Sequence, residues 1–302
     1  MLVSVYVITY NASKYILEAL DSIYNQTYDN IELIVSDDGS IDCTIPLVEE
    51  WVLKNKNRFS NVKVLKVDKN TGTAANVNRA YAAATGEWVK GLAGDDVLFP
   101  NSIETYVNFV LNNKDATWIY SKASLYYCEI REECKMEGLL HHEELCQNLN
   151  IMDTKDLYKM MYVSNFFKYP THFVKREQFL SVGGVDEEFT ILDDYPTWLK
   201  FIRNGVKCYY IDECLVGYRT SDTNVYSNKS FIVNKKIKIL EYKVKQKYIF
   251  DECPQIVKIS AWIRFKIDMF FSLSFMNKRT KFNSNLYRFV VGRLNYFTEK
   301  FM

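Results

Sequence analysis

The first 120 residues alternate short apolar segments with amphipathic ones, and this alternation is the feature that most limits the fold. Four segments have the β-branched composition of strands, and they lie at residues 2–8, 31–35, 62–67 and 88–92. Helical patterns with capping residues separate them. Strands joined by helices pair in parallel, and continuously apolar strands need cover on both faces. The sequence therefore predicts an α/β fold with a mainly parallel sheet flanked by helices.

Polar residues follow three of these predicted strands, at residues 9–11, 37–40 and 94–96. In an open parallel sheet, ligands bind beyond the carboxyl ends of the strands. Because those ends lie along one edge, we expect the three clusters to meet although they are far apart in the chain. Three polar clusters at three strand ends predict a binding site.

Two of the clusters contain adjacent aspartates, which repel each other when both are charged. For Asp95 and Asp96, a divalent cation shared with substrate phosphates would offset the repulsion, and a solvated loop is the alternative. Asp37 and Asp38 are placed to hydrogen-bond a nucleotide base or a sugar hydroxyl. A turn followed by a helix cap explains that pair equally well.

A third pair of carboxylates, Asp193 and Asp194, begins a predicted helix with Trp198, Leu199 and Ile202 on its inner face. Carboxylates are favoured in the first turn of any helix because of the helix dipole. A carboxylate in a cleft can also act as a general base that takes the proton of an attacking hydroxyl. Spacing alone does not choose between these two interpretations.

Five segments occur in order along the chain: VSVYVITYN, LDSIYNQTYDNIELIVSDDGSID, NTGTAANVNRAYAAATGEWVKGLAGDD, GGVDEEF and LDDYPTWLKF. In this order and spacing they resemble the family 2 glycosyltransferases with the GT-A fold, over about residues 2–220. The resemblance implies a Rossmann-like sheet. It also implies an inverting, metal-dependent transfer of a sugar from a nucleoside diphosphate sugar to a hydroxyl of an acceptor.

The same resemblance implies roles for individual residues. The residues that it places around the nucleotide are Thr9, Tyr10 and Asn11 at the floor of the pocket, Asp37 and Asp38 at the base, Asn78 and Arg79 in a closing segment, and Asp95 near the ribose. Asp96 is implied as the ligand of Mn²⁺ or Mg²⁺, and Asp194 as the catalytic base.

Two departures from the family pattern weaken the expected metal site. Ala93 replaces the first aspartate of the family's DxD motif, and Ser221 stands where a histidine is common.

The charge distribution predicts a division at residue 228. From residue 229 onward the chain has 16 basic and 5 acidic residues, whereas residues 1–228 have 22 basic and 32 acidic ones. We expect a catalytic domain at 1–228, with a nucleotide-binding half at 1–122 and an acceptor-binding half at 123–228. The basic, aromatic region 229–302 is expected to form helices that contact an anionic membrane or cap the catalytic domain.

We therefore expect a cytoplasmic enzyme that adds a sugar, from a UDP-sugar by resemblance, to a saccharide acceptor that is lipid-linked, in O-antigen or capsule synthesis. The start of the chain lacks a signal-peptide pattern, no segment is apolar enough to span a membrane, and the seven cysteines form no zinc motif. Nucleic acid is a poor partner for the acidic first part. The alternatives are a nucleotidyltransferase and a catalytically decayed module that only binds.

Overall fold

The computed structural model describes residues 1–136, 148–220, 231–273 and 275–299 of the 302-residue chain. These residues divide into two compact units, each described here by itself. Unit 1 comprises Met1–Asp153 and Phe166–Arg219, and unit 2 comprises Thr154–Asn165 and Thr220–Met302. The boundary expected at residue 228 lies outside the described residues. The division expected at residue 122 falls inside a strand of unit 1.

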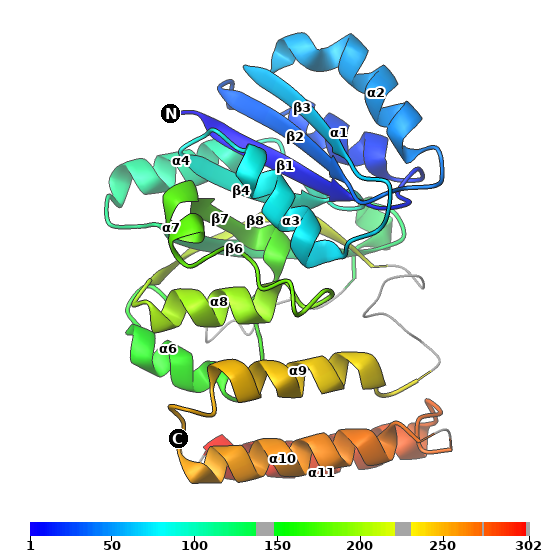
Figure 1. The fold of residues 1–302 in the computed structure, drawn as a ribbon, viewed down its shortest axis with the longest axis vertical. Helices are drawn as coiled ribbons and strands as arrows, with labels where there is room; N and C mark the ends of the chain where they lie inside the picture. The colour runs from blue at the N-terminus through cyan, green and yellow to red at the C-terminus, as the bar shows by residue number, and fades with distance from the viewer. Residues whose placement is uncertain (137–147, 221–230, 274, 300–302) are drawn as a thin grey trace. The chain divides into compact units, whose positions relative to one another are not determined.

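Unit 1 is built on one eight-stranded sheet with the strand order β3-β2-β1-β4-β7-β6-β8-β5 (Figure 1). The strands are β1 (Val3–Thr9), β2 (Ile31–Asp37), β3 (Asn61–Lys66), β4 (Trp88–Ala93), β5 (Val97–Leu98), β6 (Trp118–Tyr127), β7 (His172–Lys175) and β8 (Cys208–Thr220). The four strands expected from the first apolar segments pair in parallel as β3-β2-β1-β4. Beyond β4 the sheet becomes antiparallel, because β7 pairs in the opposite direction with both β4 and β6.

Helices cover both faces of this sheet (Figure 1). They are α1 (Ile16–Tyr24), α2 (Thr44–Asn55), α3 (Thr73–Ala83), α4 (Ser102–Asn112), α7 (Arg176–Ser181) and α8 (Asp194–Arg203). On one face, α1, α2 and α4 bury their apolar stripes in one core with the sheet, in which Tyr106 of α4 stacks on Phe173 of β7. On the other face, Tyr6 of β1 packs on Tyr81 of α3, which stacks on Phe179 of α7 with ring centroids 3.5 Å apart. The predicted two-sided α/β sheet is confirmed.

The described residues of unit 2 form the helices α6 (Thr154–Met161), α9 (Lys235–Tyr248), α10 (Gln255–Phe271) and α11 (Lys281–Glu299). The Asn234 side chain caps α9 by accepting a hydrogen bond from the Ile237 N–H. Tyr242 of α9 stacks on Phe265 of α10, with centroids 4.5 Å apart. Helices are thus present where the basic C-terminal region predicted them. A search of the described part of the chain found no helix with the length and apolarity needed to cross a bilayer.

A buried carboxylate joins the first strands of the sheet. Glu32 of β2 is fully buried and accepts hydrogen bonds from the Ser4 hydroxyl at 2.6 Å and the Thr85 N–H at 2.8 Å. Lys63 of β3 lies 3.2 Å away. Burial alone would raise the pKa of Glu32, but these hydrogen bonds outweigh it and lower the pKa to about 2. Glu32 is therefore ionised and paired in the folded chain.

Replacing this carboxylate should destabilise the fold in a pH-dependent way. Glu32→Gln places an amide N–H against one of the N–H or O–H donors, so we expect the free energy of unfolding at pH 7 to fall by about 1–3 kcal/mol. Because the folded pKa is below the unfolded value of about 4.3, the difference should shrink as the pH is lowered from about 5 toward 2. Urea unfolding at several pH values measures it. Glu50→Gln, in an exposed α2 pair with Lys54, is the control and should change little.

Candidate functional site

The loops that follow β1 and β2 are fastened to each other at the carboxyl edge of the sheet. The Asn11 N–H donates to the Ser40 hydroxyl at 2.8 Å, and the Ile41 N–H donates back to the Asn11 side-chain oxygen at 2.9 Å. Asn11 has a φ of 51°, a left-handed conformation that asparagine tolerates better than most residues. Tyr10, beside it, is 48% exposed. Two segments expected to share a site are therefore adjacent.

The two aspartates after β2 are both buried, and the protein itself occupies their oxygens. Asp37 accepts from the N–H groups of Gly39 and Ser40, which is a turn. Asp38 accepts from the Thr71 hydroxyl at 2.5 Å and from the Gly72 N–H at 2.8 Å. The contacts of Asp37 are those of a turn, whereas Asp38 holds the distant loop at Thr71 and Gly72. The role in binding a nucleotide base that the resemblance implies stays a prediction.

Asn78 and Arg79 of α3 also make contacts within the protein. The Asn78 side chain donates to the Val185 carbonyl and to Glu187, and accepts from the Val185 N–H at 2.8 Å. It thereby holds the turn that contains Gly183 and Gly184, both with positive φ. Arg79 pairs with Asp38 at 2.9 Å. The closing role predicted for Asn78 and Arg79 remains untested, whereas their part in joining distant segments is plain.

Thr9 ends β1 with a buried hydroxyl. Within the described residues, no group hydrogen-bonds the Thr9 Oγ1, although the residue is only 4% exposed. Gly94, which follows β4, approaches it closely: a Cβ added at Gly94 would lie 3.0 Å from this oxygen and 3.2 Å from the Ile16 side chain. A buried hydroxyl without a partner is rare in proteins and is suited to receive a ligand group.

Asp95 and Asp96 extend from the end of β4 beside Thr9 and Gly94. Asp96 is 2% exposed, and its Oδ1 accepts a hydrogen bond from the Arg219 N–H at 2.8 Å. Burial raises the pKa of Asp95. Burial and then the charge of Asp95 raise the pKa of Asp96 well above its usual range. The pair is therefore poorly stabilised as two carboxylates, although Arg219 lowers both pKa values.

Arg219 of β8 is the principal residue of this site that the sequence did not indicate. It is buried, and its Nε donates to the Asp95 carbonyl at 2.7 Å. One terminal nitrogen pairs with Glu18 of α1 at 2.5 Å, and the guanidinium lies 4.2 Å from the centre of the Tyr15 ring. The available signal was the Tyr218-Arg219 pair shortly before Ser221.

A second unexpected cation, Lys90, lies within β4. Its ammonium group is buried and donates to the carbonyls of Gly91 and Pro170. Burial lowers the pKa of Lys90 to about 7, while the charge of Asp96 opposes this shift. A single lysine in the apolar segment Trp88–Ala93 was the available signal, because a buried lysine requires hydrogen-bond partners.

Asp193 and Asp194 lie at the start of α8, whose apolar face is firmly packed. Trp198 of this helix stacks on His172, with ring centroids 3.8 Å apart. Burial and then the charge of Asp194 raise the pKa of Asp193 to about 7. A fixed helix start thus places Asp193, with its raised pKa, next to Asp194.

Tyr218 connects the two carboxylate pairs. Burial raises the pKa of its phenol, and the charges of four carboxylates raise it further: Asp96, Asp95, Asp194 and Asp193. The residues predicted as metal ligand and catalytic base therefore both act electrostatically on Tyr218, although about 100 residues separate them in the chain.

The donor set at Asp95 and Asp96 suits a hard divalent cation that takes its remaining ligands from water and phosphate. In the described part of the chain, His, Cys, Asp and Glu side chains nowhere gather in threes to hold a metal. Ala93 contributes no ligand, and Ser221 lies outside the described residues. The two carboxylates, whose mutual repulsion a cation relieves, therefore fit a metal that is held jointly with a substrate.

Known proteins share this sequence pattern. Residues 4–138 match the sequence model of the family described as Glycosyl transferase family 2. An uncharacterized glycosyltransferase of Haemophilus influenzae is 28% identical over 251 residues, which are 78% of this chain and 72% of that protein. TuaG of Bacillus subtilis, a putative teichuronic acid biosynthesis glycosyltransferase, is 25% identical over 229 residues, covering 76% of this chain and 82% of TuaG.

Solved structures share the fold. S. aureus TarS 1-349 in complex with UDP-GlcNAc has a TM-score of 0.62 at 18% identity, covering 97% of this chain and 80% of that one. The mannosyltransferase PcManGT from Pyrobaculum calidifontis, in complex with GDP-Man and Mn²⁺, has a TM-score of 0.57 at 19% identity over 87% of this chain and 69% of that one. The fold is thus that of the GT-A glycosyltransferases, as predicted. The match of residues 4–138 to the model of glycosyl transferase family 2 confirms the resemblance over that part of the chain.

The repulsion between Asp95 and Asp96 can be measured without any substrate. Asp96→Asn keeps the oxygen that accepts from the Arg219 N–H but removes a charge. With a chelator present to remove metal ions, we expect the free energy of unfolding at pH 8 to be about 1 kcal/mol higher for the variant than for the wild type. Because the folded pKa of Asp96 is raised, the wild type loses stability as the pH rises, and the gain from the variant should diminish at lower pH. Urea titrations test this, with the exposed Asp115→Asn as the control. An equal gain at every pH would contradict the explanation.

Proposed function

We propose that unit 1 binds a nucleoside diphosphate sugar, with UDP as the nucleotide, and transfers its sugar to a hydroxyl of a saccharide. The observation that carries the proposal is the buried Asp95-Asp96 pair at the end of β4, held by Arg219 next to the Thr9 hydroxyl, which has no partner in the described part of the chain. The UDP-GlcNAc complex of TarS supports a UDP-linked donor. The nucleotide contacts are those implied by the resemblance, with Asp95 near the ribose.

The reaction is a single displacement. The acceptor hydroxyl transfers its proton to the Asp194 carboxylate while its oxygen bonds to the anomeric carbon of the sugar. The bond between that carbon and the diphosphate oxygen breaks, and its electron pair leaves with the nucleoside diphosphate. Because the hydroxyl attacks opposite the leaving group, the anomeric configuration is inverted. Asp193, whose pKa of about 7 lets it carry a charge near neutral pH, raises the proton affinity of Asp194 when it is ionised.

Mn²⁺ or Mg²⁺ at Asp96 would supply positive charge that stabilises the departing diphosphate. The Mn²⁺ complex of PcManGT supports this choice of cation. The protein prepares the position with its own groups. The N–H and Nε of Arg219 hold Asp96 and the carbonyl of Asp95, so that both carboxylates keep their direction before a substrate arrives.

The acceptor in this proposal is a lipid-linked saccharide, and the product is a bacterial surface polysaccharide of the O-antigen or capsule type. The description of TuaG in teichuronic acid biosynthesis supports a polysaccharide product. The excess of basic residues from 229 onward supports a reaction at the cytoplasmic face of a membrane that carries such acceptors.

Nucleotide binding is tested by thermal unfolding with UDP, GDP, CMP and dTDP, each with and without Mn²⁺. We expect a Mn²⁺-dependent rise in Tm with UDP, since a ligand at about 100 times its Kd adds about 2.7 kcal/mol of stability. Asp96→Asn should lose the Mn²⁺-dependent part, and the exposed Asp115→Asn should keep it. No shift with any of the nucleotides would contradict the proposed donor site.

The base is tested by the release of UDP from UDP-sugars, with water as the acceptor. Asp194→Asn should lower this rate by about 100-fold or more while the UDP-induced Tm shift is retained, because general base catalysis contributes that much to the rate and nothing to nucleotide binding. Normal turnover by this variant would show that Asp194 is not the base.

Asp193, the neighbour of Asp194, provides the matched comparison for the Asp194→Asn variant. The wild-type rate should rise as the pH passes about 7, where Asp193 becomes ionised beside Asp194. Asp193→Asn should retain activity but lose this rise, since its side chain stays neutral throughout. A rate profile with the same rise in both proteins would exclude Asp193 as its origin.

A further inference from the structure

The contact between α10 and α11 contains a polar cluster beside its apolar side chains, among them Phe271 and Val291. Arg264 and Asp268 of α10 form an ion pair at 3.2 Å. The Tyr287 hydroxyl of α11 donates to Asp268 at 2.8 Å, and Arg264 donates to Asn295 at 3.2 Å. One helical stripe of α10 therefore directs its polar groups toward α11.

The opposite polarity appears on the side of these helices that unit 2 leaves uncovered. The exposed stripe of α10 and the segment after it consists of Ile259, Trp262, Ile263, Lys266, Phe270 and Leu273. On α11, Phe282, Phe289 and Tyr296 are 73%, 62% and 57% exposed. Exposed apolar residues are ordinary when scattered, but a continuous stripe on two adjacent helices indicates an interaction surface.

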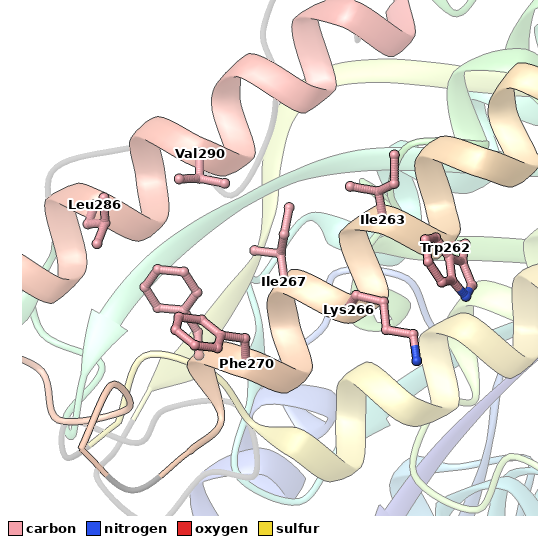
Figure 2. A pocket seen from close by; sticks show the side chains of 8 residues that line it. Trp262, Ile263, Lys266, Ile267, Phe270, Leu286 and Val290 are labelled. Carbon is pink, nitrogen blue, oxygen red and sulfur yellow. The ribbon is translucent and has the colours of Figure 1, made fainter.

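A groove of about 430 Å³ runs along this surface between the two helices. Figure 2 shows Ile263 and Ile267 of α10 and Leu286 and Val290 of α11 lining it from two sides. At its edge the Lys266 ammonium lies 5.5 Å from the centre of the Trp262 ring. The groove is apolar, and its rim combines an aromatic ring with a positive charge.

The charges around the surface have one sign. The exposed charged residues between positions 255 and 298 that the structure describes are all basic: Lys266, Lys278, Arg279, Lys281, Arg288 and Arg293. The one acidic residue in that stretch, Asp268, is buried in its pair with Arg264. An occupant of this surface must therefore offer apolar groups together with negative charge.

We propose that the exposed face of α10 and α11 rests on an anionic lipid bilayer, with Trp262, Phe270 and Phe289 among the acyl chains. The basic side chains then lie at the depth of the lipid phosphates, as in amphipathic helices that lie in the membrane interface. A second copy of the chain fits this face less well, because two such surfaces would bring like charges together. The inference deepens the proposed function, on which it rests for a reason to bind a membrane.

Vesicle sedimentation with the full chain tests the surface. We expect binding to vesicles of equimolar phosphatidylglycerol and phosphatidylcholine, weak binding to phosphatidylcholine alone, and loss of binding in high salt. The double variant Phe270→Ser with Phe289→Ser should reduce binding at least tenfold, as should Lys266→Glu with Arg288→Glu. Leu53→Ser, at a residue of α2 that is 73% exposed, is the matched control and should bind like the wild type.

Tryptophan fluorescence locates the contact within the chain. Of the five tryptophans, Trp262 is 51% exposed and the other four are at most 7% exposed. Anionic vesicles should therefore shift the emission to shorter wavelength through Trp262, and brominated acyl chains should quench it. Trp262→Phe should still sediment with the vesicles but show neither change. Sedimentation with unchanged fluorescence would place the contact elsewhere and overturn the assignment.

Membrane binding and the proposed activity are tested by separate measurements. UDP release from a soluble UDP-sugar needs no bilayer, so the surface variants should retain it, which also shows that they are folded. A chain that releases UDP but ignores both kinds of vesicle would overturn this inference and leave the proposed function standing. A dimer in solution that the Phe270→Ser, Phe289→Ser variant dissociates would assign the face to a second copy instead. Vesicle binding without UDP release would support this inference and count against the proposed function alone.

Discussion

The candidate site depends on holding two carboxylates, Asp95 and Asp96, together at the end of a buried strand. Their repulsion and burial make the doubly charged state unfavourable, and Arg219 reduces that cost through its N–H, its Nε and its charge. Gly94 lets this segment pass close to Thr9, so the pair lies at the edge where β1 also ends. Two buried carboxylates whose charges are only partly offset suit the divalent cation of the proposed function.

The surrounding loops contribute rigidity. Asp38 joins the loop after β2 to Thr71, Gly72 and Arg79, and Asn78 fastens α3 to the turn at Val185. Most of the polar groups at the strand ends are therefore saturated by the protein. Thr9, whose buried hydroxyl has no partner among the described residues, is different. Groups that are already satisfied shape the pocket, whereas those that are not are available to a substrate.

In unit 2, the distribution of polar and apolar side chains on α10 and α11 is unusual. A helix pair in water normally buries its apolar side chains and exposes its polar ones. In α10 and α11, the Arg264, Asp268 and Tyr287 cluster is inside and Trp262, Phe270 and Phe289 are outside. In water this arrangement exposes large apolar side chains, which is unfavourable. It is suited to an interface where apolar chains and phosphates lie within a few ångströms of each other. The excess of positive charge in this region is consistent with that setting.

Local pattern was sufficient to predict the parallel strands, the helices between them and the polar clusters at the strand ends, because strand and helix periods are written in neighbouring residues. The resemblance, which rests on short ordered segments, also singled out Asp96 and Asp194, whose roles stay predictions. Local pattern could not find Arg219, which reaches Asp96 from 123 positions further along the chain. Nor could it decide between a turn and a nucleotide contact at Asp37, or tell which face of α10 is exposed, since apolar residues lie on more than one side of that helix.

Composition and periodicity thus determined the sheet and the edge at which the polar clusters lie. Packing between distant segments alone decided which polar groups are satisfied, because burial and hydrogen bonding depend on partners that the local sequence does not contain.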